Sequence, residues 1–64
     1  MFSYREKANC AKREVEQRRF VYERAVKTGR MKEGFALRQI ALMEEIADDY
    51  EKLADEEDAK ERLL

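Results

Sequence analysis

The sequence predicts an all-α protein, an antiparallel hairpin of two helices at about 4–27 and 33–62 that forms one domain over residues 1–64. Three observations predict this fold. Ala, Glu, Lys, Leu and Arg make up 38 of the 64 residues, a composition typical of long helices and coiled coils. The chain has no Pro, and its two Gly residues lie near the middle. In each half, apolar residues recur at alternating spacings of three and four, the period of a helix that packs on another helix.

The first predicted helix has clear signals at both ends. Ser3 and Glu6 form the S-x-x-E pattern of a capping box, in which the two side chains satisfy free backbone N–H groups at a helix start. Lys27 places a positive charge in the last turn, which is favourable to the helix dipole. Gly29 can adopt the left-handed conformation that ends many helices. We therefore expect helix from Tyr4 to Lys27 and a turn at about 28–32.

The second predicted helix begins less well than it ends. Lys32 is a poor N-cap, and Gly34 in the first turn costs about 1 kcal/mol relative to Ala. Glu33 partly offsets this, because a negative charge is favourable at a helix start. Lys60 and Arg62 give the favourable positive charge at the other end.

When the chain reverses at this turn, the apolar stripes of the two helices face each other. The numbers of contacting residues then add up to about 62, so that Val15 meets Ala47 and Tyr22 meets Ile40. Large residues face small ones along this seam, which lets the helices approach closely. The predicted seam consists of Tyr4, Ala8, Ala11, Val15, Tyr22, Ile40, Met43, Ala47, Tyr50 and Ala54.

Charge supports the antiparallel topology independently. Residues 1–32 carry a net charge of +6, and residues 33–64 carry −7. A hairpin places these opposite charges side by side, which selects it over arrangements that bring like charges together. Local pairs at i,i+4, namely Glu14–Arg18, Arg19–Glu23 and Glu23–Lys27, support the first helix.

Arg18 is the one charged residue on the apolar stripe of the first helix. The antiparallel register places it beside Glu44, and an ion pair between the two would fix the register. The alternative is that Arg18 extends from the seam to water.

The second helix carries more apolar surface than a two-helix hairpin covers. A second stripe, interrupted by Gln39 and Asp49, runs beside the seam, and we expect it to bury itself in a homodimeric four-helix bundle. A monomeric hairpin and one that docks a different protein are the alternatives. The residues predicted for self-association are Phe35, Leu42, Ile46 and Leu53, with Phe20 and Val21 at the periphery.

A basic row on the first helix suggests a second hypothesis, nucleic-acid binding. Arg5, Lys12 and Arg19 recur every seven residues and could follow phosphates. Glu16 and Glu23 lie on the same face, and the acidic second helix would repel a polyanion. A solvated face that pairs the two helices is therefore the favoured interpretation.

Several functional classes are excluded by composition. Without His and with only Cys10, there is no zinc site of the usual kind, no disulfide framework and no Ser-His or Cys-His catalytic pair. The acidic run 55–58 lacks the ligand spacing and glycine of an EF-hand. We therefore expect a non-enzymatic protein with no cofactor and no metal. No apolar run approaches the roughly 18 residues that cross a membrane, and a cytoplasmic location is expected.

The turn and the second helix resemble a class of small bacterial and prophage-like proteins. The resemblance rests on Gly29-Arg30-Met31, preceded by Tyr22 and Val26, and on the pattern I-x-x-M-E-x-I-x-x-D-Y at 40–50. It covers about residues 13–53 and implies a helical hairpin, without an established activity. Members of the class commonly carry Thr or Ser after the Met as a helix cap, and Lys32 departs from this pattern.

Overall fold

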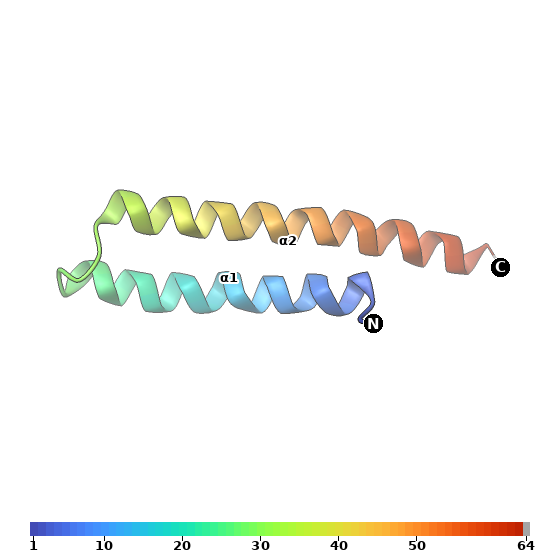
Figure 1. The fold of residues 1–64 in the computed structure, drawn as a ribbon, viewed down its shortest axis with the longest axis horizontal. Helices are drawn as coiled ribbons and strands as arrows, with labels where there is room; N and C mark the ends of the chain where they lie inside the picture. The colour runs from blue at the N-terminus through green and yellow to red at the C-terminus, as the bar shows by residue number, and fades with distance from the viewer. Residues whose placement is uncertain (64) are drawn as a thin grey trace.

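A computed structural model describes residues 1–63 and shows two helices packed side by side as an antiparallel hairpin (Figure 1). Helix α1 spans Tyr4–Lys27 and helix α2 spans Glu33–Arg62, which are the predicted bounds. The hairpin is a rod with extents of 53 × 16 × 16 Å. The C-terminal end of α2 projects beyond the start of α1.

Helix α1 is closed at its start by the capping box. The hydroxyl of Ser3 accepts a hydrogen bond from the backbone N–H of Glu6 at 3.1 Å, and the backbone N–H of Ser3 donates to the Glu6 carboxylate at 3.3 Å. These two bonds satisfy N–H groups that have no partner inside the helix. The S-x-x-E pattern at Ser3 therefore forms the capping box that the sequence predicts.

The turn between the helices depends on Gly29, whose φ of +76° lies in the left-handed region that favours glycine. This conformation directs the N–H groups of Arg30 and Met31 back to the carbonyl of Ala25, at 2.9 and 3.3 Å. The carbonyls at the end of α1 are thereby satisfied. At the other side of the turn, Lys32 makes no side-chain cap for α2, in agreement with the weak start that its sequence predicts.

The buried core between the helices is built from small side chains. Val15 packs with Ala11 and Ala47, and Met43 lies against this cluster. Within residues 1–63 no large side chain is fully buried. Small residues let the two helices approach closely, but they remove little apolar surface from water. The buried residues are Ala8, Ala11, Val15, Ala36, Ala47 and Ala54.

The other predicted seam residues lie at the edges of this contact. Tyr22, Ile40, Met43 and Tyr50 are half-buried. Tyr4 is more exposed, and its ring lies 6.4 Å from that of Tyr50. Large seam residues therefore flank the alanines instead of being enclosed by them.

Candidate interaction surfaces

One face of the hairpin is held together by charged contacts between α1 and α2. Nη1 of Arg5 lies 2.9 Å from Oε1 of Glu51, and its Nη2 lies 2.8 Å from a carboxylate oxygen of both Asp55 and Asp58. Nζ of Lys12 lies 2.7 Å from Oε2 of Glu51, which is buried beneath these contacts. We call this surface the ion-paired face, and it consists of Arg5, Lys12, Arg19, Glu44, Glu51, Asp55 and Asp58.

These contacts favour the charged forms of Glu51 and Arg5. Lys12, and after it Arg5, hold the pKa of the Glu51 carboxyl below its ordinary value, although partial desolvation opposes them. Hydrogen bonds to Asp55, then to Asp58 and Glu51, raise the pKa of Arg5. The network links the start of α1 to the second half of α2.

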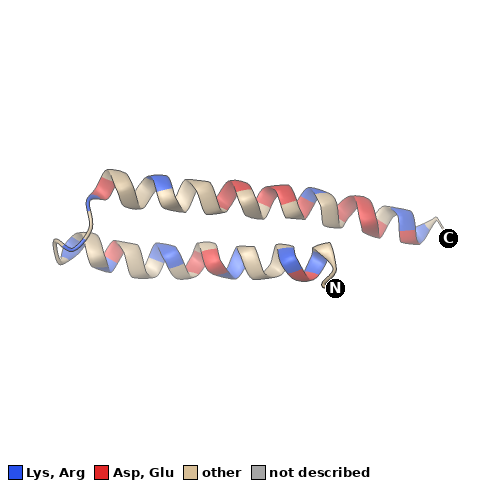
Figure 2. Cartoon of the chain, viewed as in Figure 1, with Lys and Arg blue, Asp and Glu red and all other residues tan. Residues whose placement is uncertain are grey.

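The predicted charge pairing is present in the part of the hairpin away from the turn, between residues 5–19 of α1 and 44–58 of α2. Basic residues are concentrated in α1 and acidic residues in α2 (Figure 2). Nη2 of Arg19 lies 2.7 Å from Oε1 of Glu44. Arg19 was expected to pair with Glu23 in its own helix, and this is wrong, because the contact across the hairpin takes its guanidinium. Glu23 pairs only with Lys27, at 3.2 Å, among the residues described.

Arg18 does not make the ion pair with Glu44 that the sequence suggests. Its Nε lies 3.0 Å from Oε1 of Glu14, and its Nη1 donates a hydrogen bond of 3.1 Å to the backbone carbonyl of Gln39. Glu44 instead lies on the ion-paired face with Arg19. The half-buried guanidinium of Arg18 is therefore satisfied by a backbone carbonyl and by a carboxylate of its own helix. The contact with the backbone carbonyl cannot be predicted from residue types.

The basic row proposed for nucleic acid lies within the ion-paired face. Arg5, Lys12 and Arg19 each contact at least one carboxylate of α2. A phosphate would have to displace those carboxylates and would meet their negative charge. The geometry thus weighs against phosphate binding by this row.

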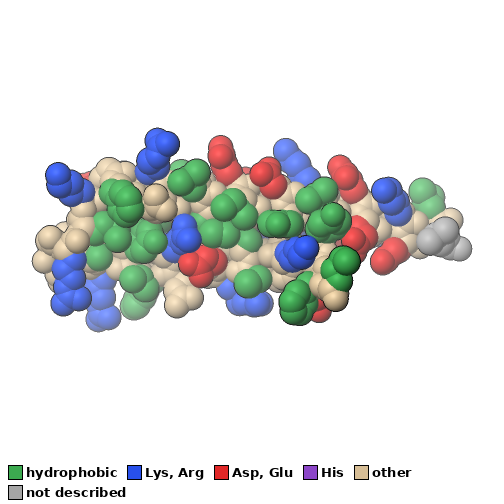
Figure 3. Space-filling view, viewed as in Figure 1, with side chains coloured by type: hydrophobic (Ala, Val, Ile, Leu, Met, Phe, Trp, Pro, Cys, Tyr) green, Lys and Arg blue, Asp and Glu red, His purple; other side chains and the backbone are tan. Residues whose placement is uncertain are grey.

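Hydrophobic side chains gather on another surface of the rod. Figure 3 shows a face on which they form a nearly continuous band along α2 and along the line between the helices. Phe35 is 55% exposed, Leu42 and Ile46 are each 43% exposed, and Leu53 is 38% exposed. We call these four residues the α2 stripe.

The α2 stripe and the ion-paired face lie on opposite sides of α2. At about 100° per residue, Glu44 is rotated by about 160–200° from both Leu42 and Ile46, and Glu51 is rotated by about 160° from Leu53. α1 contacts α2 through the seam and the ion-paired face, so it leaves the stripe uncovered. The stripe is the largest aligned set of exposed apolar side chains on α2.

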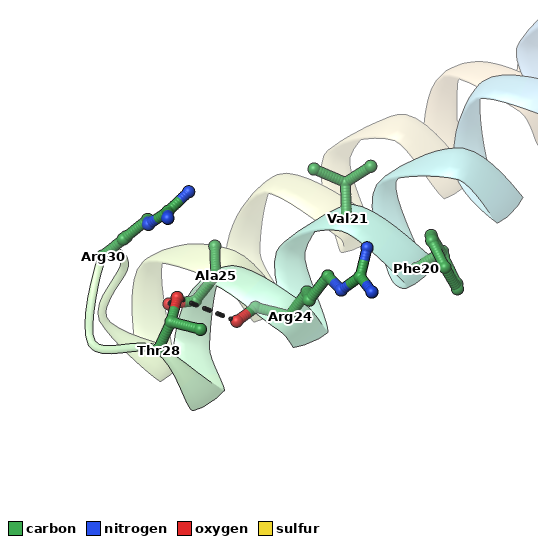
Figure 4. Close-up of a pocket in the computed structure, with 6 residues that line it drawn as sticks. All are labelled: Phe20, Val21, Arg24, Ala25, Thr28 and Arg30. Carbon is green, nitrogen blue, oxygen red and sulfur yellow. Dashed lines mark hydrogen bonds between the residues drawn. The ribbon is translucent and has the colours of Figure 1, made fainter.

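The two peripheral residues predicted on α1 lie in the half of that helix nearer the turn. Phe20 and Val21 line a shallow pocket near the turn, together with Arg24 and Thr28 (Figure 4). The guanidinium of Arg24 lies 5.6 Å from the centre of the Phe20 ring, and the hydroxyl of Thr28 donates to the carbonyl of Arg24 at 3.1 Å. Phe20 therefore belongs to the outer surface of α1, where it stacks with an arginine of its own helix.

Two further features were not anticipated from the sequence. Nζ of Lys7 lies 5.4 Å and 5.9 Å from the ring centres of Tyr4 and Tyr50, so the ammonium covers this aromatic pair. Leu37 is 59% exposed and lines a depression beside Val26, on the side of the ion-paired face. Leu37 is thus an exposed leucine of α2 that lies outside the α2 stripe.

Residues 1–63 offer no group of His, Cys, Asp and Glu side chains arranged to hold a metal ion. Of the two helices in this part of the chain, neither is long and apolar enough to cross a membrane. Cys10 is exposed and free. Comparison with protein families, with curated proteins and with solved structures finds no match for this chain.

Proposed function

We propose that the protein is a non-enzymatic self-association module, in which the α2 stripe of one copy packs on the α2 stripe of a second copy. The observation that carries this proposal is the alignment of Phe35, Leu42, Ile46 and Leu53 on the side of α2 that α1 leaves uncovered. The two hairpins together form a bundle of four helices. The two α2 helices meet at its centre.

The composition of the core supports a second copy. A hairpin whose buried residues are five alanines and one valine gains little from the hydrophobic effect, so further burial is valuable to it. Burying the remaining half of each stripe side chain contributes about 1 kcal/mol, or about 8 kcal/mol for the eight side chains of a pair. Association entropy offsets at least about 4 kcal/mol of this. With the smallest of these costs, the net of about 4 kcal/mol corresponds to a Kd of about 1 mM.

The polarity of α1 supports pairing through α2. Seven-residue periodicity places Lys7, Glu14 and Val21 on the part of α1 that borders the stripe side of the hairpin, and the first two are charged. An α1 helix would bring these charges against the partner's leucines. The partner's α2 stripe brings apolar side chains instead.

Sedimentation equilibrium across a concentration series up to about 1 mM tests this function. The wild-type mass is expected to rise with concentration from that of the monomer toward twice that value. The double variant Leu42→Glu/Ile46→Glu is expected to stay monomeric, because it places charge in the buried contact. Leu37→Glu is the matched control: it changes an exposed leucine of α2 on the other side of the helix, and it should dimerise like the wild type.

Two results would contradict the proposal. A wild-type mass that stays monomeric throughout would leave the stripe to a foreign protein, such as a phage or host factor, which is the alternative use of this surface. A dimer that Leu37→Glu weakens as much as Leu42→Glu/Ile46→Glu would place the contact elsewhere. Circular dichroism measures the helical content of each chain and so distinguishes both results from unfolding.

Nucleic-acid binding is the competing function, and fluorescence anisotropy with labelled DNA and RNA at low salt tests it. No binding is expected, since α2 carboxylates neutralise Arg5, Lys12 and Arg19. Binding that is lost on replacing these three residues would establish it instead.

We also place the protein in the cytoplasm, because the exposed thiol of Cys10 has no disulfide partner and suits a reducing compartment.

A further inference from the structure

The row of residues that contains the α2 stripe has the same spacing and the same order of polar and apolar residues in both directions. Its members are separated by alternating steps of three and four residues, symmetric about position 44, and the two end residues carry opposite charges. Every member is exposed except Gln39, which is half-buried. We call it the palindromic row, and it consists of Lys32, Phe35, Gln39, Leu42, Ile46, Asp49, Leu53 and Glu56.

We propose that two copies pack antiparallel along this row, about a two-fold axis level with residue 44, so that paired residue numbers add up to 88. The proposal rests on the self-association function and specifies the orientation and register of the partner copy. Four kinds of contact follow, each made twice because the interface is symmetric. They are Leu42 with the partner's Ile46, Phe35 with the partner's Leu53, Gln39 with the partner's Asp49, and Lys32 with the partner's Glu56.

Charge complementarity selects the antiparallel orientation. In it, the ammonium of Lys32 faces the carboxylate of the partner's Glu56, and the amide of Gln39 can donate to the carboxylate of the partner's Asp49. Neither Lys32 nor Asp49 nor Glu56 has an ion-pair partner within residues 1–63. A parallel, in-register pair would place each of these charges against its own copy. The dipoles of two long helices also favour the antiparallel arrangement.

The polar members of the row select one register among those that a heptad repeat permits. Slipping one helix by seven residues in one direction places Gln39 opposite the partner's Leu42 and leaves the amide without a partner. Slipping it in the other direction places Ile46 opposite the partner's Asp49. Only the register centred on position 44 pairs every apolar member with an apolar member and every polar member with a polar one. Polar residues within an apolar seam commonly fix register in this way.

Two like-charge contacts oppose the packing. Arg38 approaches the partner's Lys52 at the exposed edge of the row. Glu45 lies beside the axis in both copies, at the exposed edge of the row, where its carboxylate approaches that of the partner. Water screens this repulsion, so it is small compared with the burial of the stripe. The repulsion between the two Glu45 carboxylates weakens the dimer, but it does not favour another register.

Charge reversal at the ends of the row tests the orientation. Lys32→Glu alone and Glu56→Lys alone each create two like-charge contacts, and each should weaken the dimer about tenfold by sedimentation equilibrium. The double variant restores opposite charges and should return to within about threefold of the wild type. Lys32→Glu favours the dipole of α2, and Glu56 is exposed, so the hairpin stays folded in each variant. Arg13→Glu, an exposed reversal on α1, is the matched control and should leave the dimer unchanged.

Disulfide trapping tests the register in a Cys10→Ser background. A mixture of Phe35→Cys and Leu53→Cys chains should form the mixed disulfide under mild oxidation, whereas Leu53→Cys chains alone should not crosslink. Self-crosslinking of Leu53→Cys, or a double charge variant that is no tighter than the single ones, would overturn the antiparallel register while leaving the self-association function intact. A wild-type chain that stays monomeric would contradict both.

Discussion

Replacing Val15 by Ala is expected to destabilise the hairpin by about 1.5 kcal/mol. Val15 is 7% exposed and packs with Ala11, Ala47 and Met43. Removing two buried methyl groups costs about 1.6 kcal/mol in transfer free energy, and the cavity left behind raises this to about 2 kcal/mol. The better helix propensity of Ala returns about 0.5 kcal/mol.

Val21→Ala is the matched control, because it makes the same chemical change in the same helix at a side chain that is 48% exposed. Its smaller loss of burial and its equal gain in propensity should nearly cancel. Urea unfolding followed by circular dichroism measures both variants, at one low protein concentration so that dimer formation does not contribute. With an m-value of about 1 kcal/mol/M, Val15→Ala lowers the midpoint by about 1.5 M. Equal midpoints for the two variants would refute the alanine–valine core.

Three further predictions concern the ends of the helices and the ion-paired face. Since the pKa of Glu51 is lowered in the folded state, its contribution to stability is complete above its ordinary pKa of about 4.3 and is lost as the pH falls through the folded value. Thermal unfolding between pH 7 and pH 3 should therefore be less pH-dependent in Glu51→Gln, and an unchanged profile would contradict this. Gly29→Ala should cost about 1 kcal/mol, because the φ of Gly29 is +76°. Gly34→Ala should stabilise by about 0.5 kcal/mol, because Gly34 lies in the helical first turn of α2 and no atom is near the new methyl group. If chemical denaturation gave effects of equal sign, the backbone conformation would not determine these two changes in stability. Ser3→Ala should cost about 1 kcal/mol by the same assay, and no change would show that the capping box does not stabilise α1.

The fold could be predicted from the sequence because its determinants are local. The capping box at Ser3, the positive charge of Lys27 and the glycine after it define α1 within a few residues of each end. The alternating spacing of small and large apolar residues defines which side of each helix meets the other. Opposite net charges in the two halves then select the antiparallel hairpin.

The individual charged contacts could be predicted only in part. Two of these contacts follow from the heptad positions that flank the seam. Lys12 pairs with Glu51 and Arg19 pairs with Glu44, and the residue numbers of each pair add up to 63. The contacts of Arg5 with several carboxylates depend on the length of its side chain. The hydrogen bond from Arg18 is accepted by a backbone carbonyl. Sequence patterns describe side chains, so a backbone acceptor is not visible in them.

The α2 stripe was also recognisable in part. The spacing of Leu42, Ile46 and Leu53 placed them outside the seam, and the structure adds that they lie opposite the ion-paired face. Phe20 was grouped with them because it is apolar. Helical periodicity places Phe20 nearly opposite the seam of α1, and the structure adds its contact with Arg24.

Isotope-filtered nuclear Overhauser spectroscopy most directly tests whether a second copy covers the α2 stripe. A mixture of methyl-labelled and unlabelled chains, at about 1 mM so that the dimer is populated, reports only contacts between copies. Cross-peaks between the methyl groups of Leu42 and the partner's Ile46 are expected. A spectrum without contacts between copies, from chains that sediment as monomers at the same concentration, would contradict the covered stripe.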